Sequence, residues 1–217
     1  MTFKKTAIAL TFLGLGVSGL AIASPIQTGS PYVSLQLGYG GIDSKSYGNL
    51  GTTGNRLTQK NTGFSYRVSG GYLFNITNNL KIGPELGYFG YPKDKYTHPN
   101  FTFELKGYSV DLLANARYTF NNMLYGFVKG GFAYTQQKLT MSNPANPNQN
   151  LSNTKSKLLP ALEVGLGYKI NQNMSLDASY HRVFGDADVL NGGNLNSLND
   201  AKIGPVSAWL VGFNYNF

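Results

Sequence analysis

The sequence predicts an all-β protein, an eight-stranded antiparallel up-and-down transmembrane β-barrel preceded by a cleaved signal peptide. Three observations support this prediction. Apolar and polar residues alternate through eight segments, short connections alternate with long ones, and the apolar positions are nearly free of charge. Alternation with a period of two is typical of a strand whose two faces meet different media.

The first 23 residues are expected to form the signal peptide. Lys4 and Lys5 precede the apolar stretch TAIALTFLGLGVSGL, and Ala21 and Ala23 are the small residues before Ser24. A basic N-terminal region, a short apolar run and an A-x-A cleavage site are the three parts of a secretory signal peptide. The barrel domain is therefore expected to occupy 24–217.

The eight alternating segments follow one another along the chain. Every second residue is mostly aliphatic or aromatic, and Ser, Gly, Asn and isolated charges stand between them. The expected strands are 32–40, 64–74, 80–90, 108–120, 124–134, 158–170, 174–181 and 209–217. A soluble sheet would carry many charges on its polar face, so this composition favours an apolar face toward lipid and a polar face toward a narrow lumen.

The connections between these strands also alternate. Those at 75–79, 121–123 and 171–173 are short and Asn-rich, as tight turns are. Those at about 43–60, 92–104, 135–157 and 186–202 are long and polar. Strict alternation places all four long connections at one end, which is the layout of an outer-membrane barrel with short periplasmic turns and long external loops.

Aromatic residues gather near both ends of the expected strands. With the first strand running outward, one group lies at the outer rim and a second group at the inner rim, as in the aromatic belts of membrane proteins. The outer group is Tyr39, Tyr66, Tyr88, Tyr108, Tyr134 and Tyr180, and the inner group is Tyr72, Phe74, Tyr118, Phe120, Tyr168, Tyr215 and Phe217.

Four stretches, YVSLQLGYG, GGYLFNITNNLKIGPELGYFG, NARYTFNNMLYGFVKGGFAY and VGLGYKINQNMSLDASYHRVFG, resemble the outer-membrane β-barrel domain family. This group includes opacity-type surface proteins and the membrane domain of OmpA-like proteins. The resemblance implies a monomeric eight-stranded barrel in the outer membrane of a Gram-negative bacterium. It implies no single activity, because such barrels serve as adhesins, serum-resistance factors, wall-linked anchors and occasionally lipid-modifying enzymes.

Charged residues are expected in the lumen. An eight-stranded barrel is filled by its own side chains, and a buried charge needs a partner. Neighbouring strands offer the pairs Arg67 with Glu85 and Lys129 with Glu163, so we expect a structural ionic plug, with a gated narrow ion path through it as the alternative. The nine lumen charges are Arg67, Lys81, Glu85, Asp111, Arg117, Lys129, Glu163, Lys169 and Asp177.

The sequence indicates no catalytic, cofactor-binding or metal site. It has no Cys and two His, of which His98 lies in a connection beside Pro. His181 is expected to face the lumen near Ser179, but alternate residues of one strand have nearly parallel side chains, so these two are poorly placed for a catalytic hydrogen bond. Ser109 or Ser207, on another strand, is the alternative serine partner for His181. The His-x-Ser pattern of lipid A deacylases of this shape is absent, since the sequence reads HRV.

The external connections are therefore expected to carry the function. The first three are net basic and the fourth is net acidic, within a formal net charge of +8 for the chain. Basic surfaces attract lipopolysaccharide phosphates and acidic host-surface or serum components. We expect a structural and surface-interaction protein that serves in adhesion, serum resistance or envelope integrity. No nucleic-acid-binding module is present.

The chain ends in WLVGFNYNF, another alternating segment. We expect this strand to pair with the first one and close the barrel, which removes both sheet edges. It also resembles the C-terminal signal by which the barrel assembly machinery recognises its clients. The residues of this expected signal are Trp209, Val211, Phe213, Tyr215 and Phe217.

Overall fold

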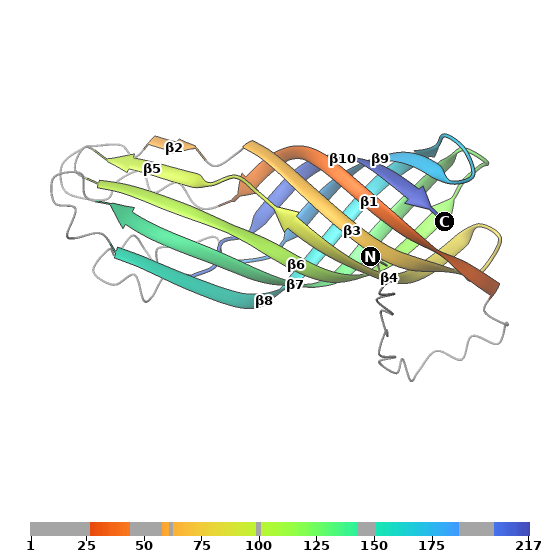
Figure 1. The fold of residues 1–217 in the computed structure, drawn as a ribbon, viewed down its shortest axis with the longest axis horizontal. Helices are drawn as coiled ribbons and strands as arrows, with labels where there is room; N and C mark the ends of the chain where they lie inside the picture. Colours follow the sequence, from red (N-terminus) through yellow and green to blue (C-terminus); the bar gives the residue numbers. More distant parts are fainter. Residues whose placement is uncertain (1–26, 44–57, 61–62, 99–100, 143–150, 187–201) are drawn as a thin grey trace, which may run out of the picture.

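The computed structural model describes residues 27–43, 58–60, 63–98, 101–142, 151–186 and 202–217. These residues form ten strands (Figure 1): β1 Gln27–Ile42, β2 Thr58–Lys60, β3 Gly63–Asn75, β4 Leu80–Gly90, β5 Asp94–His98, β6 Phe101–Thr119, β7 Leu124–Ser142, β8 Leu151–Lys169, β9 Met174–Val183 and β10 Val206–Asn216. Over these ranges the fold contains no helix of the length and apolarity needed to cross a membrane.

Eight of these strands close into a barrel. Neighbours pair antiparallel in the order β6, β4, β3, β1, β10, β9, β8 and β7, and β7 pairs again with β6. The ends of the chain meet where β1 pairs with β10, from Tyr32 opposite Asn216 to Ile42 opposite Val206. Strands β2 and β5 stand outside this circle, with β5 paired to the start of β6. The predicted eight-stranded antiparallel barrel is confirmed, whereas the expected signal peptide, residues 1–23, lies outside the described residues.

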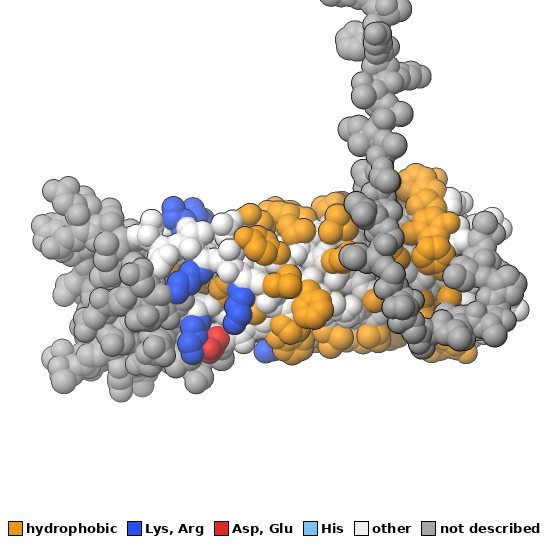
Figure 2. All heavy atoms as spheres, turned by 90° about the horizontal axis from the view of Figure 1, so that it is seen from below, with side chains coloured by type: hydrophobic (Ala, Val, Ile, Leu, Met, Phe, Trp, Pro, Cys, Tyr) orange, Lys and Arg blue, Asp and Glu red, His pale blue; other side chains and the backbone are white. Residues whose placement is uncertain are grey.

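Side chains alternate between the outside and the inside of the barrel wall, and those on the outside are apolar along the lipid-facing band. Contrary to the prediction from the sequence, the inward side chains are not all polar: toward the outer end of the lumen they form a buried apolar cluster that includes Phe89, Leu113 and Leu210. On β10, Trp209 is 70% exposed whereas the next residue, Leu210, is 2% exposed. On the face that Figure 2 shows, hydrophobic side chains cover much of the length of the wall, and most of the Lys and Arg side chains lie beyond them toward one end. An exterior of this kind is stable only in contact with lipid.

The three short connections are tight turns held by their own polar side chains. The Asn121 side-chain oxygen accepts hydrogen bonds from the backbone N–H groups of Met123 and Leu124, at 2.9 and 2.7 Å. Asn171 repeats this arrangement with Asn173 and Met174. The side chain imitates a backbone turn, which explains why these connections are rich in Asn.

The strands run further outward than the sequence predicted. Strand β5 forms a hairpin with the start of β6 inside 92–104, and β7 and β8 pair within 135–157, out to Met141 opposite Leu151. Alternation is hard to see there because side chains beyond the lipid can be polar on both faces. Backbone hydrogen bonds do not need that alternation, so the paired strands continue past the membrane.

Aromatic rings form contacts along both rims of the apolar band. On one side Tyr66, Tyr88 and Tyr108 follow one another across β3, β4 and β6, with ring centroids 6.1 and 5.6 Å apart. Near the short turns, the ring of Tyr118 packs on that of Phe120, the first residue after β6, with ring centroids 5.5 Å apart. These contacts fit the two belts expected from the sequence.

Gly87 shows how little room the lumen has. It faces inward on β4, and a Cβ atom built there would lie 2.4 Å from an Arg67 guanidinium nitrogen and 2.7 Å from an Asp111 carboxylate oxygen. Real Cβ atoms do not approach other atoms so closely. Glycine at this position therefore lets the two charged groups meet.

We predict that Gly87→Ala lowers the free energy of unfolding by about 1–3 kcal/mol, because the added methyl group forces the Arg67 and Asp111 side chains apart. Denaturant titration of the membrane-inserted protein, followed by emission of the single tryptophan, measures this loss. The control is Gly130→Ala, whose Cβ would meet nothing within 4 Å. Equal stabilities for the two variants would contradict the packing argument.

Candidate functional site

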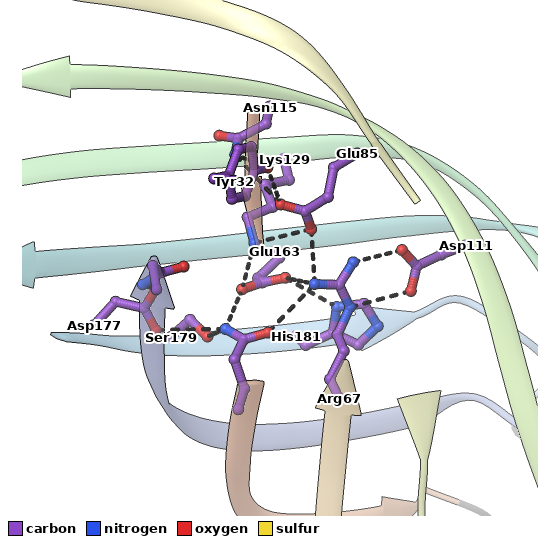
Figure 3. Close-up of polar contacts among 12 residues, drawn as sticks. Tyr32, Arg67, Glu85, Asp111, Asn115, Lys129, Glu163, Asp177, Ser179 and His181 are labelled. Carbon is purple, nitrogen blue, oxygen red and sulfur yellow. Dashed lines mark hydrogen bonds and ion pairs between the residues drawn. The ribbon is translucent and has the colours of Figure 1, made fainter. Parts of the chain in front are cut away.

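The lumen holds a cluster of buried charges centred on Arg67. Arg67 rises from β3, and its guanidinium lies 2.5 Å from Asp111 of β6 and 2.7 Å from Glu85 of β4. It also reaches Glu163 of β8 across the lumen, at 3.3 Å. Figure 3 shows the guanidinium between these three carboxylates. One cation thus links strands on opposite sides of the barrel.

Lys129 is the second cation of this cluster. Its ammonium on β7 lies 3.1 Å from Glu85 and 3.2 Å from Glu163. The second carboxylate oxygen of Glu85, Oε2, accepts a hydrogen bond from the Tyr32 hydroxyl. The Tyr32 hydroxyl in turn accepts a hydrogen bond from the Asn115 amide at 2.7 Å. The pairings Arg67–Glu85 and Lys129–Glu163 are those that the sequence indicated, whereas the roles of Tyr32 and Asn115 were missed.

Gln36 connects Asp177 to the ion pairs. Its amide donates to Glu163 at 2.8 Å and to Asp177 at 3.4 Å, and its carbonyl accepts from Arg67 at 3.3 Å. Asn214 donates a further hydrogen bond to Asp177 at 2.7 Å. Position 36 follows the lumen-facing alternation of the first strand, and that alternation was the only sign of its role.

His181 packs in the lumen without a serine partner among the described residues. It is fully buried, its ring meets the Phe89 ring at 4.7 Å, and its Nδ1 lies 3.5 Å from Glu163. The candidate serines are engaged elsewhere: Ser179 with Gln36, Ser109 with Thr135 and Ser207 with Asp43. No triad is assembled around His181 in this part of the chain. The side chain of His98 lies outside the described residues.

The remaining three lumen cations form no ion pair with an acid of this cluster among the described residues, although Arg117 contacts the ring of Tyr32. Lys81, Arg117 and Lys169 stand near the short turns on β4, β6 and β8, and the acid of each strand lies four to six residues further outward. At about 3.3 Å per residue, the Cα atoms of each cation and of the acid on the same strand are therefore roughly 13–20 Å apart along the strand. The sequence predicted one mixed plug, whereas the structure separates an ion-paired middle from a basic inner end.

The ion-paired middle is suited to closing the lumen. Arg67, Glu85 and Glu163 have no solvent-exposed side-chain surface, and Lys129 is 2% exposed. Breaking one such pair leaves an uncompensated buried charge, whose cost of several kcal/mol holds the side chains in place. The cluster thus fills the barrel at this level.

The C-terminal strand lies as the sequence predicted. Trp209, Val211, Phe213 and Phe217 are exposed on the outer face, while Tyr215 is partly buried. The backbone N–H of Phe217 donates to the carbonyl of Pro31 on β1 at 3.1 Å, and its ring meets the Tyr215 ring edge-on at 5.0 Å. The last residue is therefore anchored at the inner rim.

Comparison with known proteins supports the same architecture. The family model described as "Outer membrane protein beta-barrel domain" matches residues 7–217. An uncharacterized protein of Coxiella burnetii is 30% identical over 93% of this chain and 97% of its own length. Outer membrane protein P5 of Haemophilus influenzae is 32% identical over 48% of this chain and 33% of its own length. The crystal structure of Neisserial surface protein A shares the fold, with a TM-score of 0.51, 17% identity and coverage of 88% of this chain and 100% of that one.

We predict that Arg67→Met lowers the free energy of unfolding by about 3–5 kcal/mol, because Asp111, Glu85 and Glu163 lose their shared cation. The control is Lys106→Met, which removes an exposed cation and should change stability by less than about 0.5 kcal/mol. Denaturant titration in lipid vesicles measures both. Similar losses in the two variants would contradict the role assigned to the buried cluster.

We also predict that the purified protein gives no stable conductance steps in planar lipid bilayers, because the buried cluster fills the lumen. Single-channel recording over a range of voltages is the measurement. Reproducible steps in the wild-type protein, lost in Lys129→Ala, would instead support the narrow ion path.

Proposed function

The chain belongs to the outer membrane protein beta-barrel domain family, and we propose that it acts as a structural and surface-interaction protein. It is an integral outer-membrane protein of a Gram-negative bacterium. Its outer end would bind anionic partners: lipopolysaccharide phosphates, and acidic host-surface or serum components. In this role it contributes to adhesion, serum resistance or envelope integrity as a monomer.

The observation that carries this proposal is a pair of lysines directly opposite each other. Lys106 of β6 and Lys138 of β7 are Cα partners in the register, and both are exposed on the outer wall. Like charges in this position destabilise a strand pair. An anionic partner would relieve the repulsion, so the pair is better explained by binding than by stability.

Further cations accompany this pair. Lys93 is 60% exposed, although it lies 3.1 Å from Glu104, and Lys157 is also exposed. Lys93, Lys106 and Lys138 line one hollow together with Tyr91. Exposed ion pairs contribute little stability, so Lys93 remains available to an anion.

A non-catalytic role is supported by the lumen. His181 is packed against Phe89 and Glu163, and the nearby serines bond to other side chains. A general base needs to reach the proton it removes, and a fully buried imidazole cannot reach a substrate. We therefore place the function at the outer surface.

Assembly is expected to depend on the C-terminal strand. The barrel assembly machinery would recognise the outward row that ends at Phe217, which is 67% exposed. Its ring adds contact with lipid, and its backbone adds one hydrogen bond to β1. The terminal ring thus matters more for insertion than for the finished barrel.

We predict that Lys106→Gln/Lys138→Gln reduces binding of bacteria displaying the protein to immobilised heparin, used as an acidic probe, by about tenfold at low salt. The double substitution removes two charge-assisted contacts with heparin. The difference in binding between variant and wild type should shrink at higher salt, because salt screens the surface charges. Survival of the same strains in serum is the second readout.

The matched control is Lys81→Gln/Lys169→Gln, which removes two lysines from the opposite end of the barrel. This variant should bind heparin like the wild type. Unchanged binding by Lys106→Gln/Lys138→Gln, at equal surface levels of folded protein, would overturn the proposal.

A further inference from the structure

The inner end of the barrel opens into a cavity of about 880 Å³. Side chains of the three short turns and of the adjoining strand ends line it. Its charged lining side chains are Lys81, Arg117 and Lys169, and no Asp or Glu is among the described residues that line it. Phe217, whose backbone ends in a carboxylate, also lines it. The rest of the lining is mostly Asn, Ser and Thr, with a few rings at the rim.

Arg117 is buried in this cavity without an acidic partner. It is 6% exposed, and its guanidinium carbon lies 4.5 Å from the Tyr125 ring centre and 5.4 Å from that of Tyr32. Its buried Nε has no hydrogen-bond partner among the described residues. Aromatic rings thus orient the guanidinium, in place of the carboxylate that a buried arginine ordinarily contacts.

The two lysines stand close to this arginine. Lys81 of β4 is the direct Cα partner of Arg117 of β6 in the register. The Lys169 ammonium donates to the Thr119 hydroxyl at 3.3 Å, and Thr119 is the next residue but one after Arg117 on β6. Within the described residues no carboxylate forms an ion pair with any of the three. Their mutual repulsion is therefore not offset by an ion pair within the described residues.

We propose that this inner cavity binds a phosphoryl group presented from the periplasm. A phosphate monoester carries about −1.5 to −2 charges at neutral pH, which balances most of the charge of three cations. A guanidinium offers two parallel N–H donors to phosphate oxygens, and ammonium groups add point charges. A single carboxylate would leave two of the cations uncompensated. The lining amides and hydroxyls would hold the remainder of the molecule.

The phosphoryl group could belong to a soluble periplasmic molecule or to a phospholipid headgroup. The three cations face the lumen, whereas lipid contacts the outer wall, where Phe120 and Tyr168 of the same rim are exposed. A headgroup would have to cross this aromatic rim to reach Arg117. This geometry favours the soluble source. The site lies at the end opposite Lys106 and Lys138, so it is independent of the surface interaction proposed above.

The test is isothermal titration calorimetry with pyrophosphate as the probe, on protein folded in a maltoside detergent that carries no phosphate. We expect Lys81→Gln/Lys169→Gln to weaken binding by about tenfold, because two charge-assisted contacts are lost. Both lysines are only partly buried, so the fold should survive, and circular dichroism checks it. Lys106→Gln/Lys138→Gln is the control, with the same loss of net charge at the other end. It removes the outer lysine pair proposed above to bind anions, so the pyrophosphate binding that it retains should be that of the inner cavity, with unchanged affinity.

Two results would overturn the proposal: absence of pyrophosphate binding to the folded wild type, or equal weakening in the two double variants, which would indicate attraction by net charge alone. A second titration in phosphatidylcholine nanodiscs, with and without phosphatidylglycerol, separates the sources. Competition by phosphatidylglycerol that requires Lys81 and Lys169 would support the phosphoryl site and assign it to lipid. Absence of competition would support the soluble ligand.

Discussion

The antiparallel pairing of β1 with β10 is the interaction on which the rest of the structure depends. It gives the first and last barrel strands a neighbour on both sides, so that no sheet edge meets hydrocarbon, where each unpaired backbone group costs several kcal/mol. Closing eight strands also fixes the width of the interior, which leaves room for side chains but for no wide channel. The charged side chains of the lumen therefore either find partners within the chain or lie at a barrel end.

This narrow interior explains how the lumen charges are arranged. In the middle, Arg67 and Lys129 share the carboxylates of Glu85 and Glu163, and Gly87 leaves the space that the arginine needs. At the inner end water has access, so Arg117 can be held by aromatic rings without a carboxylate. The same barrel thus combines a closed middle with an open, basic inner cavity.

The outer surface of the barrel changes from apolar to polar along its length. Where lipid surrounds the wall, outward residues are aliphatic or aromatic, as Trp209 illustrates. Beyond the lipid the backbone pairing of β6, β7 and β8 continues, but the outward residues become polar, including Lys106 and Lys138. The extended strands hold these lysines beyond the apolar band.

The sequence by itself determined the strands, their inward and outward faces, the tight turns and two of the ion pairs, because alternation and neighbouring strands suffice for these. The hydrogen bond of Tyr32 to Glu85 and the reach of Arg67 to Glu163 joined strands that are not neighbours. Such contacts depend on register, strand tilt and barrel width, which no local pattern records. Only the tertiary structure could therefore separate the paired charges of the middle from the unpaired cations Lys81, Arg117 and Lys169 at the inner end.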